Sequence, residues 1–489
     1  MEGKAADEKI TEWMNRGILT KESILGILYE RIQGSSSIDD DERSALATTF
    51  QSACDSDGHL TEASFNSLLH DTSSLTPCQE SNAGFKMILE SIAYLSTLPF
   101  PERPLQPTPE HLSLPQLTRG LVWGLPGRYR YIIEQGGWSR MRTDADHRRL
   151  LFQSLASLYS PEPHYDTEAA RKLALRNALD VDEFWQDIAV CNHDPDGDEI
   201  YHDLLDVLYS SQEIKHELIA GVHRNGFRAI AKTIAITETN GPPPKLQHLA
   251  ISPTRFTSLL TLLLALQFQP DNSTPNPQFL SQFEPSARFL CNTFTDPTTG
   301  LVTWPMFDHG LKSVAPYLFD PFYKLLGNAF LKDRQSTQPH SSFFAIFSGG
   351  FTDLPTSFLP ETETVVTLPV IAQLVCFLGG SAIYTPIISR VRHHSFRSGV
   401  GGEAPPSSVG EFVTALETVP DELFLFVSGR VGGVGERVIF GVFSPKPSLD
   451  GGCIQVANPP NHVGKEGCAV FQIAPRQDLF RGVVGRGGW

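Results

Sequence analysis

Two acidic stretches carry oxygen ligands and a glycine at the spacing that a calcium-binding EF-hand loop uses. In the first stretch, Asp55 and Asp57 stand at loop positions 3 and 5, and Gly58 stands at position 6, where the chain must turn sharply. Positions 1 and 12 are Ala53 and Ser64, so both end ligands are missing, including the bidentate glutamate that closes the coordination shell. The first stretch therefore predicts a metal-free helix-turn-helix.

The second acidic stretch supplies a fuller set of ligands. With Gly197 at loop position 6, positions 1, 3, 5 and 12 are Asn192, Asp194, Asp196 and Asp203. Glu199 replaces the aliphatic residue of position 8, and an aspartate at position 12 is shorter than the usual glutamate. These residues fit either an acidic turn or a weak ion site of a calcium-responsive sensor, and the two departures favour the turn. We therefore expect no metal and no cofactor.

No stretch places a nucleophile, a base and an oxyanion donor where a catalytic site needs them. Ser428 and Gly429 follow a predicted strand, but no helix opens after them, so the nucleophile turn of a hydrolase is not indicated. Gly433 and Gly435 lack the third glycine of a dinucleotide-binding loop, because Val438 stands in its place. The sequence predicts a protein without catalytic residues, and an unrecognised hydrolase is the alternative from the enzyme class.

Basic residues cluster at the start of a helix predicted over 143–159. The cluster consists of Arg140, Arg142, Arg148 and Arg149, preceded by Arg128 and Arg130. Asp144 and Asp146 lie in the first turn, where the helix dipole favours negative charge, and they balance part of the positive charge. Most charge runs are solubilising surface, so a solvated helix face is the simpler interpretation. The functional interpretation is a docking patch for an acidic partner.

The clearest pairing signal in the chain is a predicted β-hairpin near the C-terminus. Residues 423–427 and 438–443 are dominated by aromatic and β-branched side chains, and several glycines between them allow a tight connection. Because both runs are almost entirely apolar, we expect both strands to be buried on both faces. The connection would present Arg430, Glu436 and Arg437 from a rigid scaffold, which suits partner binding.

Helical periodicity fills most of the chain before this hairpin. The spacing of apolar residues predicts helices over 85–95, 117–133, 143–159, 252–268, 285–294, 311–331 and 368–378. We therefore predict an α+β protein with three parts. These are a variable segment over 1–45, a helical region with degenerate EF-hand-like turns over 46–335, and a domain rich in strands over 345–489.

The acidic composition limits the classes of partner. The 55 acidic residues outnumber the 39 lysines and arginines, and the net charge of −16 repels nucleic acid and anionic lipid. The seven cysteines form no Cys-x-x-Cys motif, which indicates free thiols in a reducing compartment and no zinc site. The longest apolar run, 256–268, is shorter than the roughly 20 residues that cross a bilayer. We expect a cytoplasmic protein without an integral membrane segment that binds no nucleic acid.

The order of motifs around the hairpin resembles a TLDc domain, a β-sandwich flanked by helices. These motifs are the apolar helix over 368–378, the hairpin with Phe440-Gly-Val-Phe443, and the phrases Cys468-Ala-Val-Phe-Gln-Ile473 and Asp478-Leu-Phe-Arg481. Upstream, Leu98-Pro-Phe-Pro101 and residues 307–326 resemble the fungal TLDc proteins named for restriction of telomere capping. The resemblance spans residues 46–481.

The resemblance implies a non-catalytic regulator that acts by binding other proteins. TLDc proteins are associated with resistance to oxidative stress and with binding the vacuolar proton-pumping ATPase. A protein partner at the vacuolar membrane, reached by peripheral association, is therefore expected. The chain ends at Trp489, where a TLDc domain would continue with further strands, so the resemblance also implies a truncated sandwich with uncovered strand edges.

Overall fold

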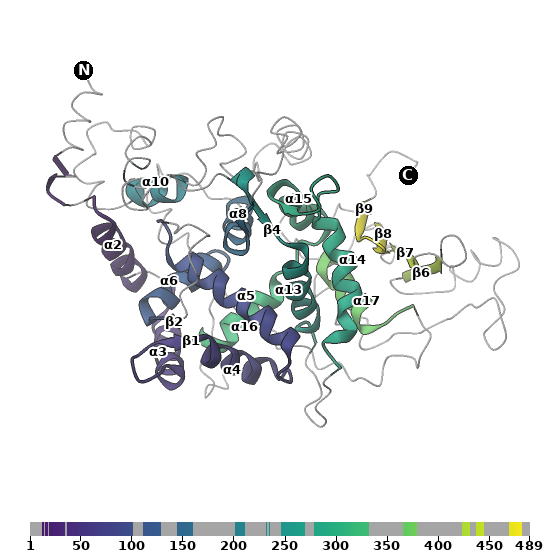
Figure 1. The fold of residues 1–489 in the computed structure, drawn as a ribbon, viewed down its shortest axis with the longest axis horizontal. Coiled ribbons are helices and arrows are strands. Elements are labelled where there is room, and N and C mark those ends of the chain that lie inside the picture. Colours follow the sequence, from purple (N-terminus) through teal and green to yellow (C-terminus); the bar gives the residue numbers. More distant parts are fainter. Residues whose placement is uncertain are drawn as a thin grey trace, which may run out of the picture. The chain divides into compact units, whose positions relative to one another are not determined.

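The computed structural model divides into two compact units, each assembled from several segments of the chain (Figure 1). Unit 1 comprises Met1–Leu259, Thr295–His309 and Phe319–Gly350, and unit 2 comprises Leu260–Phe294, Gly310–Leu318 and Phe351–Trp489. The structure describes residues 12–100 except 14, 18, 35 and 36, and residues 111–128, 144–159, 201–210, 231, 234, 246–268, 278–331, 365–378, 423–430, 437–444 and 469–481.

Unit 1 is built mainly from helices. The described helices of its first segment, Met1–Leu259, are α2 (Lys21–Gly34), α3 (Asp40–Ala53), α4 (Glu62–Ser73), α5 (Gln79–Ser96), α6 (Leu114–Gly124), α8 (Asp144–Leu155), α10 (Tyr201–Ser210), η3 (Leu246–His248) and the start of α13 (Pro253–Ala265). The later segments add α15 (Trp304–His309), α16 (Asp320–Leu326) and the π-helical turn η6 (Gly327–Leu331).

The long helix α5 packs against α4, α6 and α8 (Figure 1). Its apolar residues recur at helical spacing, and Phe85, Ile88 and Ile92 are fully buried. Gly120 of α6 faces this helix so closely that a Cβ atom there would lie 2.6 Å from the carbonyl oxygen of Ile92. The backbones of the two helices therefore approach each other at a distance that only glycine permits.

Two small antiparallel sheets join the loops of unit 1. In the first, β1 (Leu60–Thr61) pairs with β2 (His111–Leu112). In the second, the order is β3 (Ser157–Leu158), β4 (Leu249–Ile251) and β5 (Val302–Thr303). Helices begin within two residues of β1, β2, β4 and β5, so the sheets fix where α4, α6, α13 and α15 start.

Unit 2 combines helices with a four-stranded antiparallel sheet. Its helical elements are the end of α13, η4 (Ser281–Phe283), α14 (Glu284–Phe294), the π-helical turn η5 (Gly310–Val314) and α17 (Leu368–Leu378). The strands are β6 (Leu423–Arg430), β7 (Arg437–Ser444), β8 (Ala469–Ala474) and β9 (Asp478–Arg481), in the order β6-β7-β8-β9. No helix in the described ranges is both long enough and apolar enough to cross a membrane.

One face of this sheet, the inner face, packs on the helices of unit 2. Phe471 of β8 is fully buried, and its ring centroid lies 5.2 Å from that of Phe377 in α17 and 5.7 Å from that of Phe426 in β6. A Cβ atom on Gly441 of β7 would come within 2.2 Å of the Phe471 ring. The glycine therefore makes room for the Phe471 ring on the inner face.

Hydrogen bonds tie the turn between β8 and β9 to the helices. The amide of Asn292 in α14 donates to the carbonyl of Pro475 at 2.9 Å, and the Thr293 hydroxyl donates to the carbonyl of Gln477 at 2.5 Å. The Gln373 amide of α17 donates to the Ile473 carbonyl and to the Gln477 side chain. These bonds satisfy polar groups that would otherwise be buried without partners.

The mixed helix and sheet content agrees with the predicted α+β class, and the predicted hairpin is confirmed. Leu423 pairs with Ser444 and Arg430 with Arg437, with every residue between them in register. The expectation that both strands are buried on both faces is wrong. Val427 and Phe440, which lie opposite each other, are 62% and 44% exposed. The two strands therefore leave large apolar side chains exposed on one face.

The predicted helix over 311–331 is also interrupted. The structure has η5, then a non-helical stretch, then α16 and η6. Pro316 lies in that stretch, and a proline cannot donate the backbone hydrogen bond that a continuous helix needs. The predicted division into 1–45, 46–335 and 345–489 stays a prediction. The two compact units divide the chain differently, because α14 and η5 belong to the same unit as the C-terminal sheet.

The contact between α5 and α6 predicts the effect of an added methyl group. Gly120→Ala is expected to lower the free energy of unfolding by about 1–3 kcal/mol, because the Ile92 backbone cannot move aside. Gly26→Ala in α2 is the control. It has no atom within 4 Å of the new methyl group and should stabilise the helix by about 0.5–1 kcal/mol. Denaturant unfolding followed by circular dichroism measures both, and similar values for the two variants would contradict the close packing.

Candidate partner-binding site

The end of the hairpin carries two arginines directly opposite each other. β6 ends at Arg430, β7 begins at Arg437, and the two residues are partners in the strand register. Both are exposed, and neither has an ion-pair partner within the described residues. Like charges opposite each other on neighbouring strands repel, so this pair costs stability in the free protein. Glu436, the third residue expected here, lies outside the described residues.

The sheet also carries an apolar surface on one of its two faces. We call it the outer face of the sheet, opposite the inner face that packs on the helices. It consists of Leu425, Val427, Phe440, Val442, Val470 and Phe480. These residues were not expected to form a surface, because their uninterrupted apolar runs predict buried strands. Gln472 and Asp478, which stand in register with Phe440, are the polar signals that could have marked this face as exposed.

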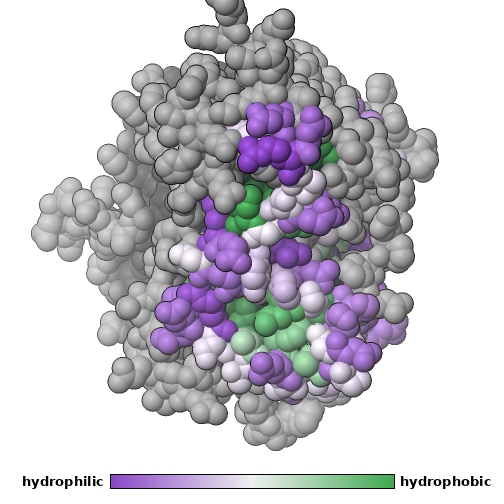
Figure 2. All heavy atoms as spheres, turned by 90° about the vertical axis from the view of Figure 1, so that its left-hand side faces the viewer, coloured by the Kyte–Doolittle hydropathy of each residue, from purple (hydrophilic) through white to green (hydrophobic). Residues whose placement is uncertain are grey.

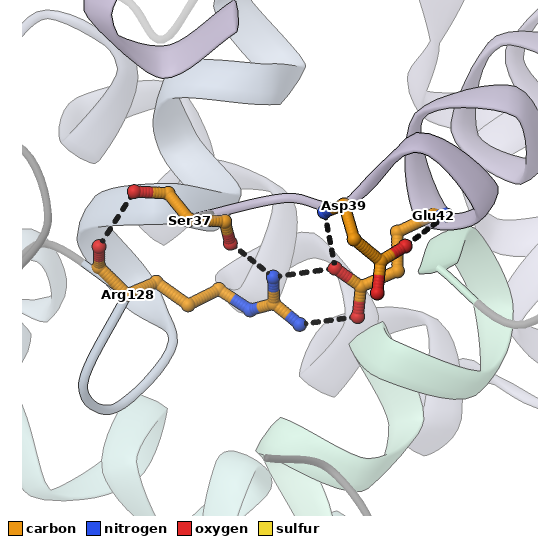
Figure 3. Close-up of polar contacts among 4 residues, drawn as sticks. All are labelled: Ser37, Asp39, Glu42 and Arg128. Atoms are coloured by element: carbon orange, nitrogen blue, oxygen red, sulfur yellow. Dashed lines mark hydrogen bonds and ion pairs between the residues drawn. The ribbon is translucent and has the colours of Figure 1, made fainter. Parts of the chain in front are cut away.

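The arginines of the predicted helical cluster form a different arrangement. Arg128 pairs with Glu42 of α3 through two hydrogen bonds of 2.8 and 2.7 Å (Figure 3). The same guanidinium donates to the carbonyl of Ser37, and the Ser37 hydroxyl donates to the Arg128 carbonyl at 3.0 Å. Glu42 also closes a capping box with Asp39 at the start of α3. One arginine therefore holds the start of a helix 86 residues away in sequence.

Arg148 and Arg149 extend from α8 to two other segments. The Arg148 Nε donates to Asp308 of α15 at 2.8 Å. Arg149 forms a bidentate pair with Asp203 of α10, at 2.7 and 3.0 Å, and the side chains of the two are 0% and 2% exposed. Arg149 also donates to Gln153 at 2.8 Å. Burial raises the pKa of the nearby Tyr94 phenol, and the negative charge of Asp203 adds to that rise.

These contacts correct both sequence interpretations of the cluster for its described members. Arg149 belongs to neither a solvated helix face nor a docking patch, because its guanidinium is buried against Asp203. Arg148 is half-buried and pairs with Asp308 of the same unit. The sequence could not show this, since Asp203 lies 54 residues further along the chain. Arg140 and Arg142 lie outside the described residues, and their partner-binding role stays a prediction.

The side of unit 1 that carries α2 and α3 shows the usual separation of polar and apolar groups. Hydrophilic residues cover most of the described surface there, and hydrophobic residues show in smaller areas between them (Figure 2).

The large hydrophobic side chains that are clearly exposed in the described part of the chain are Val427, Phe440 and Phe480, all on the outer face of the sheet.

The first acidic stretch forms a turn between α3 and α4. Gly58 has φ of 75°, and the carboxylate of Asp55 accepts hydrogen bonds from the backbone N–H groups of Asp57 and His59. The bond from His59 is the main cause that lowers the pKa of Asp55. This oxygen therefore stabilises the turn.

In the second acidic stretch, residues 192–199 lie outside the described residues. Asp203, the expected ligand at position 12, pairs with Arg149.

The chain resembles a curated fungal protein, Restriction of telomere capping protein 5 of Pyricularia oryzae. The two are 22% identical over 450 residues, which cover 81% of this chain and 63% of that protein. The chain therefore spans less than two thirds of the length of this relative. No family model and no solved structure matches the chain. The similarity supports the restriction of telomere capping name that the sequence motifs indicated.

The buried pair of Arg149 and Asp203 predicts a large cost when one partner is removed. Arg149→Met should lower the free energy of unfolding by about 3–5 kcal/mol, because Asp203 is left buried without a counter-charge. Arg149→Met combined with Asp203→Leu should recover most of this loss. Arg16→Met, which removes an exposed pair with Glu12, is the control and should cost about 1 kcal/mol or less. Equal costs at Arg149 and Arg16, measured in urea, would refute the buried pair.

A second prediction concerns pH. Burial raises the pKa of Asp320 at the start of α16 to about 7, and the charge of Lys324 opposes part of this rise. Between the unfolded value of 3.8 and about 7 the folded protein binds a proton that the unfolded chain has released, so stability falls as pH rises through this window. Asp320→Asn should remove this fall. Urea unfolding at several pH values tests it, and a wild-type curve parallel to that of the variant would contradict it.

Proposed function

We propose that this protein is a non-catalytic regulator that binds an acidic protein partner through Arg430 and Arg437. One observation carries the proposal: two exposed arginines face each other at the end of paired strands, and neither has an ion-pair partner within the described residues. An acidic group placed between them would relieve their repulsion and accept hydrogen bonds from both guanidinium groups. The free energy that the pair costs in the free protein is then recovered on binding.

The partner that we propose is the one that the resemblance to TLDc proteins implies. We propose the vacuolar proton-pumping ATPase as that partner, with the protein located in the cytoplasm and at the periphery of the vacuolar membrane. A role in resistance to oxidative stress belongs to the same proposal. The relative in Pyricularia oryzae bears a name from restriction of telomere capping, and a link of this chain to that process is proposed on the name alone.

The charge distribution supports recognition of an acidic partner by this particular site. The chain as a whole carries a net charge of −16, which repels acidic proteins at long range. A local positive pair held on a rigid hairpin opposes that average and determines which part of the surface an acidic partner approaches. Charges at the rim of an interface act mainly on the rate of association, so the arginine pair should steer the encounter.

The test is the association of the full chain with purified vacuolar ATPase, followed by surface plasmon resonance. Arg430→Glu combined with Arg437→Glu should slow association about tenfold at low salt and reduce its salt dependence. Melting should change little, because exposed charges contribute about 0–1 kcal/mol. Arg288→Glu is the control, since this exposed arginine of unit 2 already pairs with Glu284.

Two outcomes would contradict the proposal. The first is that the wild-type chain does not bind the ATPase. The second is that the double variant associates at the wild-type rate and with the wild-type salt dependence. Arg430→Lys combined with Arg437→Lys separates charge from geometry, because lysine keeps the charge and loses the planar fork of donors.

A further inference from the structure

Helices α3, α4, α5 and α6 form two helix-turn-helix halves that β1 and β2 join. In each half a two-residue strand stands directly before the second helix. Leu60 lies two residues before the start of α4, and Leu112 lies two residues before the start of α6. The two leucines are directly opposite each other in the antiparallel pair, and both are fully buried. The two halves are therefore joined through equivalent positions.

The first half keeps the geometry of an EF-hand although it lacks the end ligands. Gly58 at loop position 6 has a φ of 75°, as the sharp turn of such a loop requires. Leu60 is the aliphatic residue of position 8, and α4 begins at Glu62, position 10. EF-hands occur in pairs whose loops are joined by short antiparallel strands, so the four helices have the architecture of an EF-hand pair.

A carboxylate holds this loop together without a metal ion. Asp55 at position 3 accepts hydrogen bonds from the backbone N–H groups of Asp57 at 3.0 Å and His59 at 2.9 Å. The His59 ring lies 4.3 Å from the His111 ring of β2, which ties the loop to the second half. Ser64 at position 12 cannot supply the bidentate carboxylate of a calcium site. The shape of the loop is therefore set by the chain alone.

The segment formed by α16 and η6, residues 320–331, has the pattern of a helix that is bound along one side. Asp320, Lys324 and Asn328 recur every four residues and are partly exposed. Five apolar side chains lie between them at the spacing that a bound helix uses for its anchors, and each is at most 1% exposed. These anchors are Phe322, Leu325, Leu326, Ala329 and Phe330.

This segment packs on the first half of the EF-hand-like pair (Figure 1). Both of its parts contact α4, and η6 also contacts α3. The Phe330 ring stacks on Phe65 of α4 with a centroid distance of 5.9 Å, and both rings are fully buried. In sensor EF-hand proteins an apolar surface of the helix pair receives an amphipathic helix of a target protein. Here the corresponding surface receives a helix of the same chain.

The path of the chain shows what this contact holds. The segment belongs to unit 1, but it is flanked by chain that belongs to unit 2, Gly310–Leu318 before it and Phe351–Trp489 after it. The C-terminal sheet is therefore connected to the chain that precedes it through the docked segment.

We infer that α3, α4, α5 and α6 form an EF-hand-like recognition module whose ligand is the segment 320–331 of the same chain, bound without calcium. The inference gives the first acidic stretch a function: Asp55 keeps the module permanently in its binding form, where a sensor would need the ion. It is independent of the arginine pair on the hairpin.

The test is the binding of a fluorescent peptide of residues 319–333 to the full chain. In the wild-type chain the module is filled by its own segment, which competes at a high effective concentration. Leu326→Ala combined with Phe330→Ala weakens that internal ligand and keeps good helix formers, so this variant should bind the peptide at least about tenfold more tightly than the wild-type chain. The control peptide carries Leu326→Glu and Phe330→Glu and should not bind. The affinity should be the same in EDTA and in calcium chloride.

Two results would overturn the inference. If the alanine variant binds no peptide, or binds the control peptide equally well, the segment is part of the core and not a ligand. If calcium raises the affinity about tenfold or more, the module is a calcium sensor.

A second measurement needs no peptide and serves also if the alanine variant does not fold. Phe65→Ala removes the ring on which Phe330 stacks, so hydrogen exchange over 320–331 should become faster in the full chain. Phe152→Ala in α8 is the matched control, because this buried ring contacts Trp304 and Phe307 and should affect 304–309 instead. Equal exchange over 320–331 in the two variants, measured by mass spectrometry, would contradict the docking of this segment on α4.

Discussion

A guanidinium group that leaves water must meet a carboxylate, and the helical unit depends on this constraint. Arg128, Arg148 and Arg149 each pair with an acid from a distant part of the chain, so the pairs join α3, α15 and α10 to the centre of the unit. Removing one partner costs most stability at the pair of Arg149 and Asp203, because both side chains are fully buried. The ion pair fixes α10 together with apolar packing, because Leu204 and Leu208 of the same helix are also buried.

A different constraint organises the strand-rich unit: one face of its sheet is packed on helices, and the other face has exposed side chains. The inner face is filled by Phe471, and Gly441 is the residue that makes room for it. The outer face has equally apolar residues, and among the residues that the structure describes Val427, Phe440 and Phe480 of this face are exposed. A β-sheet needs only one packed face to be stable, so the second face is available for recognition.

Much of the local structure could be predicted from the sequence. The apolar spacing over 85–95 and 285–294 predicts α5 and α14, and the glycines and apolar runs of the hairpin predict its two strands. What failed was the burial of particular side chains. Arg149 looks like a surface residue because its partner lies far away in the sequence, and Val427 looks like a core residue because apolarity alone cannot distinguish a covered face from an open one.

The path of the chain gives α14 an unusual dependence. This helix is complete by Phe294, but its residues Asn292 and Thr293 bond to the turn at Pro475 and Gln477, which is synthesised more than 180 residues later. During translation α14 must therefore wait for nearly the whole chain to leave the ribosome before its polar groups are satisfied. A nonsense mutation between Phe351 and the start of β6 at Leu423 would leave a finished helix without the strands that pack on it, and quality control would then meet an exposed apolar surface.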